Sequence, residues 1–140
     1  MSLAHRAESV EELLAEARRG ILRLSPGQAL EATRQGARLI DIRSESQRSG
    51  DGIIPGAALV PRNALEWRLD PACEHHDPAL ARRDRQVIVI CDEGYQSSLA
   101  AANLRRLGLD AADVIGGFQA WRGAGLPVDN PPGDGGRTRD

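Results

Sequence analysis

Cys91 is the residue whose type and position could do covalent chemistry in this sequence. It ends the apolar run "VIVIC" (87–91), and the polar loop "DEGYQS" (92–97) follows it. A cysteine thiolate is a strong nucleophile, whereas a cysteine buried at the end of a strand acts only as a small hydrophobic residue. The position is compatible with both roles, and two acids, Asp92 and Glu93, stand directly after the cysteine.

The loop after Cys91 is short enough to wrap around the sulfur atom. Gly94 permits tight backbone curvature, and successive N–H groups in such a turn point inward. The apolar spacing from Ser97 to Leu107 predicts a helix with Ser97 as its N-cap, and the start of a helix carries partial positive charge. This environment favours a thiolate and could hold an anionic adduct without a side-chain base.

The segment "CEHHD" (73–77) contains residue types that bind zinc, namely Cys73, His75, His76 and Asp77. It lacks the C-x2-C or H-x3-H spacing of metal sites, and adjacent histidines in one loop rarely converge on one metal ion. We therefore expect no metal site and no cofactor. Cys73 could instead resolve a persulfide or sulfenate on the other cysteine.

Strands and helices alternate along the chain, which predicts an α/β fold with a central, largely parallel five-stranded sheet flanked by helices. The predicted strands are "ILRL" (21–24), "RLIDI" (38–42), "ALV" (58–60), "VIVIC" (87–91) and "ADVI" (112–115). The predicted helices cover 9–20, 26–36, 63–69, 97–107 and 118–125, and we interpret 44–57 as a loop. Reactive groups in such sheets gather at the C-terminal ends of the strands, where Cys91 is placed.

The pattern divides the chain into an N-terminal helical extension (1–21), one α/β domain (22–128) and a disordered tail (129–140). The extension has a capping box at Ser9 and Glu12, and it either packs on the domain or binds a partner. The tail "DNPPGDGGRTRD" has no apolar residue. We expect Trp67 and Trp121 to lie in the core or a cleft wall.

Composition and charge limit the partners and the compartment. The net charge is −2, and the 18 basic residues are all arginines, spread along the chain with no basic run longer than a pair, so we expect no nucleic-acid partner. No apolar run approaches the ~20 residues of a membrane span, and the acidic N-terminus does not match a secretion signal, so we expect no membrane partner. Two cysteines without an export signal favour the cytoplasm.

Five segments, in order and with similar spacing, resemble the rhodanese-like sulfurtransferases over roughly residues 22–128. They are "LIDIR" (39–43), "GIIPGA" (52–57), "VIVICDEGYQSS" (87–98), "AANLRRLGL" (101–109) and "VIGGFQAWRGAGLPV" (114–128). The resemblance implies an α/β fold in which Cys91 accepts a sulfane sulfur as a persulfide and passes it on. It implies that the transferred group is held by the loop amides of Asp92, Glu93, Gly94, Tyr95, Gln96 and Ser97. It also implies that Asp41 and Arg43, which match an Asp-x-Arg pair, are structural.

The chain departs from the family pattern at the loop. Many family members place a cation directly after the cysteine and another at the position of Gln96, whereas this chain has Asp92 and Glu93 after the cysteine. Two nearby carboxylates disfavour a thiolate and repel an anionic donor such as thiosulfate, each by ~1 kcal/mol or less at an exposed rim. Three arginines could reach the cleft and replace these cations: Arg43, Arg48 and Arg62.

Phosphatases and arsenate reductases of the same broad architecture need an arginine after five intervening residues, which grips the oxyanion with two hydrogen bonds. Counted from Cys91, that position is Ser97. The sequence therefore disfavours phosphate-monoester hydrolysis.

Three hypotheses follow from these residues. The first is a sulfurtransferase with a small-molecule sulfur donor and a thiol, cyanide or protein acceptor. The second is a rhodanese-fold binding or regulatory module with little turnover, motivated by the acidic loop and the N-terminal helix. The third is a thiol redox enzyme that uses Cys91 and Cys73.

Overall fold

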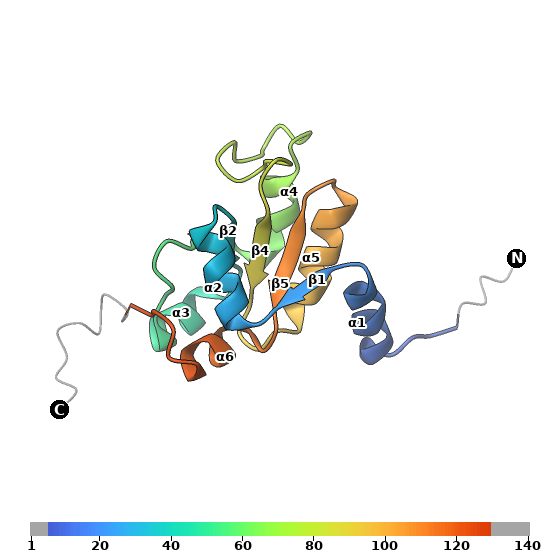
Figure 1. Ribbon diagram of the computed structural model, residues 1–140. Coiled ribbons are helices and arrows are strands. Elements are labelled where there is room, and N and C mark those ends of the chain that lie inside the picture. The colour runs from blue at the N-terminus through green and yellow to red at the C-terminus, as the bar shows by residue number, and fades with distance from the viewer. Residues whose placement is uncertain (1–5, 130–140) are drawn as a thin grey trace, which may run out of the picture.

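A five-stranded parallel sheet with helices on both faces forms the centre of the computed structural model, which describes residues 6–129 (Figure 1). The strand order is β1-β5-β4-β2-β3, and each neighbouring pair is parallel. The strands are β1 (Leu22–Leu24), β2 (Arg38–Asp41), β3 (Ala58–Leu59), β4 (Val87–Ile90) and β5 (Ala111–Val114). The predicted fold class is therefore confirmed.

The central strand, β4, is buried along its whole length and pairs with β2 and β5. A parallel sheet that is covered on both faces needs apolar side chains on both sides of each strand, which explains the unbroken sequence "VIVI". Because β4 lies in the middle of the sheet, its C-terminal end opens into the region where the loops of neighbouring strands meet.

The helices form two layers, each with its own apolar cluster (Figure 1). They are α1 (Val10–Arg19), α2 (Pro26–Arg34), α3 (Glu45–Asp51), α4 (Leu65–Leu69), α5 (Gln96–Arg106) and α6 (Gly117–Gly123), and a 3-10 turn, Arg62–Ala64, precedes α4. One cluster contains Leu65 and Leu69 of α4 and Leu104 of α5. The other contains Phe118 and Trp121 of α6.

Helix α3 corrects the interpretation of 44–57 as a loop. The Ser44 hydroxyl accepts a hydrogen bond from the Gln47 N–H, and the Gln47 side chain accepts one from the Ser44 N–H. This capping box is visible in the sequence. Periodicity missed the helix because "ESQRSGD" has no apolar stripe and no buried residue.

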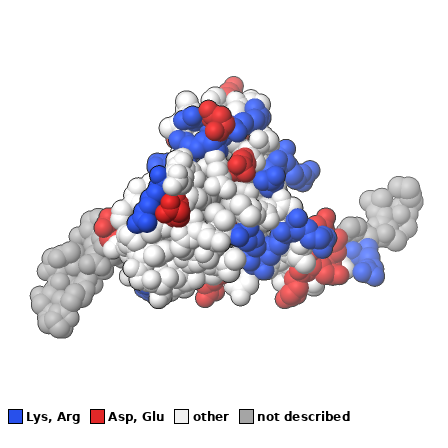
Figure 2. All heavy atoms as spheres, in the orientation of Figure 1, with Lys and Arg blue, Asp and Glu red and all other residues white. Residues whose placement is uncertain are grey.

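Helix α1 packs against α5, and the predicted capping box at Ser9 and Glu12 is present. Its Val10 and Leu13 remain 63% and 48% exposed, so only part of its apolar stripe is covered. Figure 2 shows acidic and basic side chains side by side on the surface over this helix.

Trp121 is fully buried in the core, whereas Trp67 is 58% exposed and lines a surface hollow, so each fits one of the two expected placements. Of the predicted disordered tail, only Asp129 lies within the described residues, where it pairs with Ile53; 130–140 lie outside them. Among residues 6–129, no helix has both the length and the apolar character of a membrane span.

Candidate active site around Cys91

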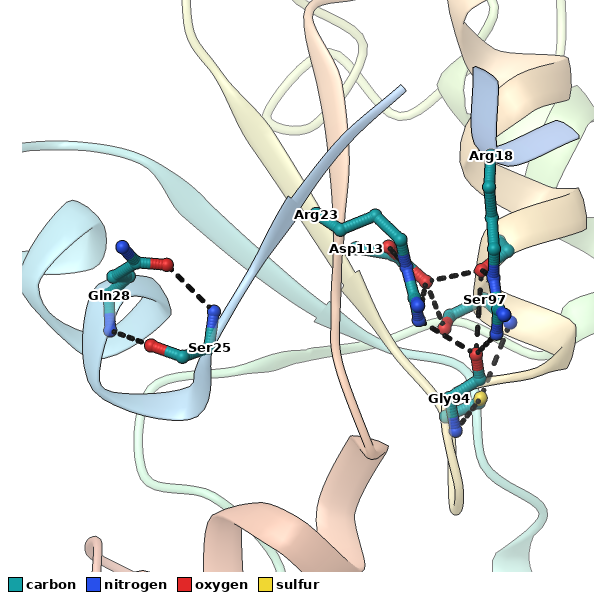
Figure 3. Close-up of polar contacts among 9 residues, drawn as sticks. Arg18, Arg23, Ser25, Gln28, Gly94, Ser97 and Asp113 are labelled. Carbon is teal, nitrogen blue, oxygen red and sulfur yellow. Dashed lines mark hydrogen bonds and ion pairs between the residues drawn. The ribbon is translucent and has the colours of Figure 1, made fainter. Parts of the chain in front are cut away.

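Cys91 lies directly after β4 and is 6% exposed. Its Sγ accepts hydrogen bonds from the backbone N–H of Gly94 at 3.1 Å and of Ser97 at 3.3 Å (Figure 3). Within the described residues these are the only loop amides that donate to the sulfur, a smaller set than the predicted 92–97. Backbone donors of this kind stabilise a sulfur anion without any side-chain base.

A cavity of about 260 Å³ opens over the sulfur. It is lined by Ile42, Arg43, Gln47, Cys91, Asp92, Glu93, Tyr95 and Gln96. The structure therefore brings most of the predicted loop residues to one cavity together with Arg43. Tyr95 is 60% exposed and lies at the rim rather than in the core.

The first turn of α6 forms hydrogen bonds to the backbone of the loop that follows Cys91. The N–H of Phe118 donates to the Cys91 carbonyl at 2.8 Å, and that of Gln119 donates to the Asp92 carbonyl at 3.0 Å. The approach is so close that Gly117, at φ 60°, leaves no room for a side chain. A Cβ there would lie 2.6 Å from the Cys91 carbonyl oxygen and 2.7 Å from the Gly94 nitrogen.

We expect Gly117→Ala to lower the free energy of unfolding by about 1–3 kcal/mol, because the left-handed backbone and the overlap with the loop are both unfavourable. Because the overlap reaches the Gly94 nitrogen, it should also slow alkylation of Cys91 by iodoacetamide. Chemical denaturation and alkylation rates measure the two effects. Gly123→Ala is the matched control in the same helix, since a Cβ there meets nothing within 4 Å. Equal behaviour of the two variants would contradict the proposed role of the close approach.

The two acids after the cysteine differ in their surroundings. The Asp92 Oδ1 accepts a hydrogen bond from the Gln119 amide at 2.9 Å, and the same amide donates to Asp51 at 3.1 Å. The carboxylate of Asp92 is therefore oriented by α6. Glu93 is exposed at the cavity rim, so its charge is the one that an incoming donor meets most directly.

Ser97 does not cap α5, which corrects the expectation from the sequence. The N-cap position is Tyr95, and no side chain caps this helix. The Ser97 and Ser98 hydroxyls each donate to Asp113 Oδ2 at 2.8 Å (Figure 3). Asp113 is fully buried in β5. Sequence reasoning missed it, although an acid inside the apolar run "AADVI" was a visible signal.

Asp41 and Arg43 form a buried ion pair beside the site. The Arg43 Nη2 lies 2.9 Å from Asp41 Oδ2, and both side chains are inaccessible to solvent. Arg43 also donates to the Gly52 carbonyl at 2.8 Å, and its guanidinium lies 3.7 Å from the ring centre of Phe118. These contacts join the end of β2 to α6. Among residues 6–129, Arg43 Nη1 has no hydrogen-bond partner, and the aromatic face offsets part of that cost.

The other two arginines proposed to reach the cleft have different partners. Arg48 donates to the Arg43 carbonyl and is absent from the cavity lining. Arg62 pairs with Glu66 at 2.8 Å and donates to the Gln96 side chain at 2.9 Å, so it reaches the rim only through Gln96. Burial alone would raise the pKa of Glu66, but hydrogen bonds from Asn103 and Arg62 outweigh burial and lower that pKa.

Cys73 lies away from the cavity that contains Cys91. It follows α4, is half-buried, and lines a separate hollow with Trp67 and Leu107. Both cysteines are free thiols. Among the described residues no cluster of three or more His, Cys, Asp or Glu side chains is arranged to hold a metal ion.

Comparisons with known proteins identify the family. The model of the rhodanese-like domain matches residues 25–124. A sulfurtransferase of Allochromatium vinosum is 30% identical over 96 residues, which cover 68% of this chain and 80% of that one. The thiosulfate sulfurtransferase GlpE of Pseudomonas aeruginosa is 29% identical over 113 residues, covering 80% of this chain and 93% of that one.

Among solved structures, a Rhodopseudomonas palustris protein of unknown function, named a "possible tyrosine phosphatase", is 30% identical with a TM-score of 0.81. The match covers 92% of this chain and all of the other, and so extends beyond residues 25–124. The parallel sheet, the cysteine at the end of its central strand and the family match lead to one conclusion: the chain belongs to the rhodanese-like domain family.

Proposed function

We propose that this protein is a sulfurtransferase that carries a sulfane sulfur on Cys91. The Cys91 thiolate attacks the outer sulfur of a donor, a new S–S bond forms, and the donor's own S–S or C–S bond breaks with the electron pair leaving on the donor. An acceptor thiolate or cyanide then attacks the outer sulfur of the persulfide, and Cys91 departs as a thiolate. Sulfur transfer of this kind needs a nucleophile and anion stabilisation but no added cofactor.

The observation that carries this proposal is the pair of backbone N–H groups, from Gly94 and Ser97, that point at Cys91 Sγ. The same donors can stabilise the anion of Cys91 before attack and the charge on the persulfide after it. The relatives named as sulfurtransferases support the assignment. Two free cysteines suit a reducing compartment, and we place the protein in the cytoplasm.

Phosphate-ester hydrolysis, suggested by the name of the Rhodopseudomonas palustris structure, has less support from the site. The position that needs an arginine is Ser97, whose hydroxyl donates to Asp113. Arg43 lines the cavity, but its guanidinium is paired with Asp41 and stacked on Phe118. A dianionic phosphate would also meet Asp92 and Glu93 at the rim.

Intact-mass spectrometry tests the proposal. The protein is incubated with thiosulfate, 3-mercaptopyruvate or glutathione persulfide, and a gain of one sulfur atom is expected on the peptide that contains Cys91. The gain should reverse with cyanide or a thiol acceptor. Absence of the added sulfur with all three donors would refute the transferase assignment and favour a rhodanese-fold binding module.

We expect the rim acids to slow anionic donors. Glu93→Gln should speed persulfide formation from thiosulfate by up to about tenfold at low salt, because one repulsive charge is removed. Asp92→Asn should have a smaller effect, since Gln119 orients that carboxylate toward α6. Stopped-flow or quenched mass measurements at low ionic strength and at about 1 M salt, where screening is nearly complete, check the prediction.

The control for these variants is Glu74→Gln, which removes an exposed acid that does not line the cavity. An equal acceleration by Glu74→Gln, or one that persists at high salt, would contradict a local electrostatic cause.

A further inference from the structure

The carbonyl of Gly94 accepts hydrogen bonds from two arginines that lie outside the loop. Arg18 Nη2 donates to it at 2.9 Å and Arg23 Nη2 at 3.0 Å, and Figure 3 shows both side chains converging there. Arg18 comes from α1 and Arg23 from β1, 76 and 71 residues before Gly94. Both arginines lie before residue 25, where the match to the family model begins.

Gly94 links these guanidinium groups to the thiol. Its carbonyl accepts hydrogen bonds from the two arginines, while its N–H donates a hydrogen bond to Cys91 Sγ at 3.1 Å. Gly94 is at φ 90°, and a Cβ there would lie 2.7 Å from the Gly116 nitrogen, so the residue has little room to shift toward α6. Its carbonyl is therefore fixed on the arginine side and its N–H on the sulfur side.

Two buried residues, Asp113 and Ser98, fix the positions of the arginines. Arg23 makes two bonds to Asp113, from Nε at 2.9 Å and from Nη2 at 3.2 Å, and Asp113 is fully buried. Arg18 Nε donates to the Ser98 hydroxyl at 2.9 Å, and its guanidinium lies 5.9 Å from the ring centre of Tyr95. Among residues 6–129, no carboxylate forms an ion pair with Arg18.

The charges around the loop are therefore asymmetric. On the side of β1 and α1, the charged groups in the hydrogen-bond network that reaches Gly94 are Arg18, Arg23 and Asp113, and together these three carry one net positive charge. The carboxylates of α1 itself, Glu11, Glu12 and Glu16, lie outside this network. On the cavity side, the titratable groups that face Cys91 are Arg43, Asp92, Glu93 and Tyr95, and Arg43 is neutralised by its partner Asp41. A cation held against the loop backbone favours an anion on the sulfur.

We propose that Arg18, supported by Arg23, is a positioning residue for the sulfur-transfer reaction. Arg18 orients the Gly94 N–H toward Cys91 and supplies the positive charge that the loop itself lacks. This inference rests on the proposed sulfurtransferase function. Helix α1 is then part of the catalytic apparatus rather than an appendage.

The test compares three variants of the full chain. Arg18→Gln retains hydrogen-bond donors without the charge, Arg18→Lys retains the charge without the planar guanidinium, and Arg19→Gln is the matched control on the exposed neighbouring residue. For each variant the pH profile of Cys91 alkylation by iodoacetamide, the rate of persulfide formation and the midpoint of chemical denaturation are measured in a Cys73→Ser background.

We expect Arg18→Gln to slow persulfide formation about tenfold and to move the alkylation profile upward by about half a pH unit or more. Arg18→Lys should recover part of the shift in the profile, and Arg19→Gln should match the parent protein. Two results would overturn the proposal. The first is an Arg18→Gln alkylation profile identical to that of Arg19→Gln. The second is a loss of persulfide-formation rate in Arg18→Gln that the lowered denaturation midpoint of this variant explains completely.

The alkylation profile needs no sulfur donor. A protein that accepts no sulfur but shows the expected shift would refute the transferase function while supporting the role of Arg18 in thiolate stabilisation. If the parent protein forms a persulfide but the alkylation profile of Arg18→Gln is unchanged, the proposed role of Arg18 is refuted and the transferase function stands.

Discussion

Replacing Cys91 with serine is expected to abolish sulfur transfer, with a loss of at least about a thousandfold in turnover with any donor. A serine hydroxyl keeps the size and the polar character of the residue, but it is not ionised at neutral pH and forms no persulfide. The Gly94 and Ser97 amides would still point at the oxygen, so anion stabilisation would remain without a nucleophile.

Cys73→Ser is the matched control, because it removes the other free thiol and leaves the Cys91 cavity unchanged. We expect this variant to retain nearly full activity in a cyanide-coupled assay. A comparable loss in both variants would contradict a single-cysteine mechanism and would favour a redox pair. If Cys91→Ser retained turnover near that of the parent protein, Cys91 would not be the nucleophile of the reaction.

Replacing Arg43 with methionine is expected to lower the free energy of unfolding by about 3–5 kcal/mol. Both members of the Asp41–Arg43 pair are inaccessible to solvent, and the substitution leaves a buried carboxylate without its cation. It also removes the donor to the Gly52 carbonyl and the stacking on Phe118. Urea denaturation followed by circular dichroism measures the change.

Arg34→Met provides the matched comparison for this substitution. Arg34 lies 3.8 Å from Glu31, and both side chains are more than half exposed. An exposed pair of this kind contributes about 0–1 kcal/mol, because solvent screens the charges. An Arg43→Met protein as stable as Arg34→Met would show that the buried pair contributes little and that the Asp-x-Arg pattern has another cause.

Local patterns predicted the framework of this protein well. The run "VIVI" predicted a buried central strand, because only continuous apolar sequence suits a parallel strand covered on both faces. The capping box at Ser9 and Glu12 predicted a helix start that the structure has. The predicted helix at 26–36 is also present, as α2. These signals lie within a few residues of each other, so the sequence displays them directly.

The candidate site was predicted in part. Cys91 and its loop could be recognised because the strand, the glycine and the following helix are contiguous in sequence. The role of Ser97 was wrong: its hydroxyl has a stronger partner in the buried carboxylate of Asp113, 16 residues later. The arginines that contact the loop also differ from the three expected from the sequence. Arg43, Arg48 and Arg62 have other partners, whereas Arg18 and Arg23 reach the Gly94 carbonyl.

The sequence by itself determined the order of the strands and of every helix except α3, the nucleophile candidate at the end of β4 and the tight turn at Gly94. Only the tertiary structure decided which charges surround the loop. Periodicity reports which face of an element is apolar, but it carries no information on where a long side chain ends. Arg18 meets Gly94 because α1 packs on α5, and that contact depends on the whole fold.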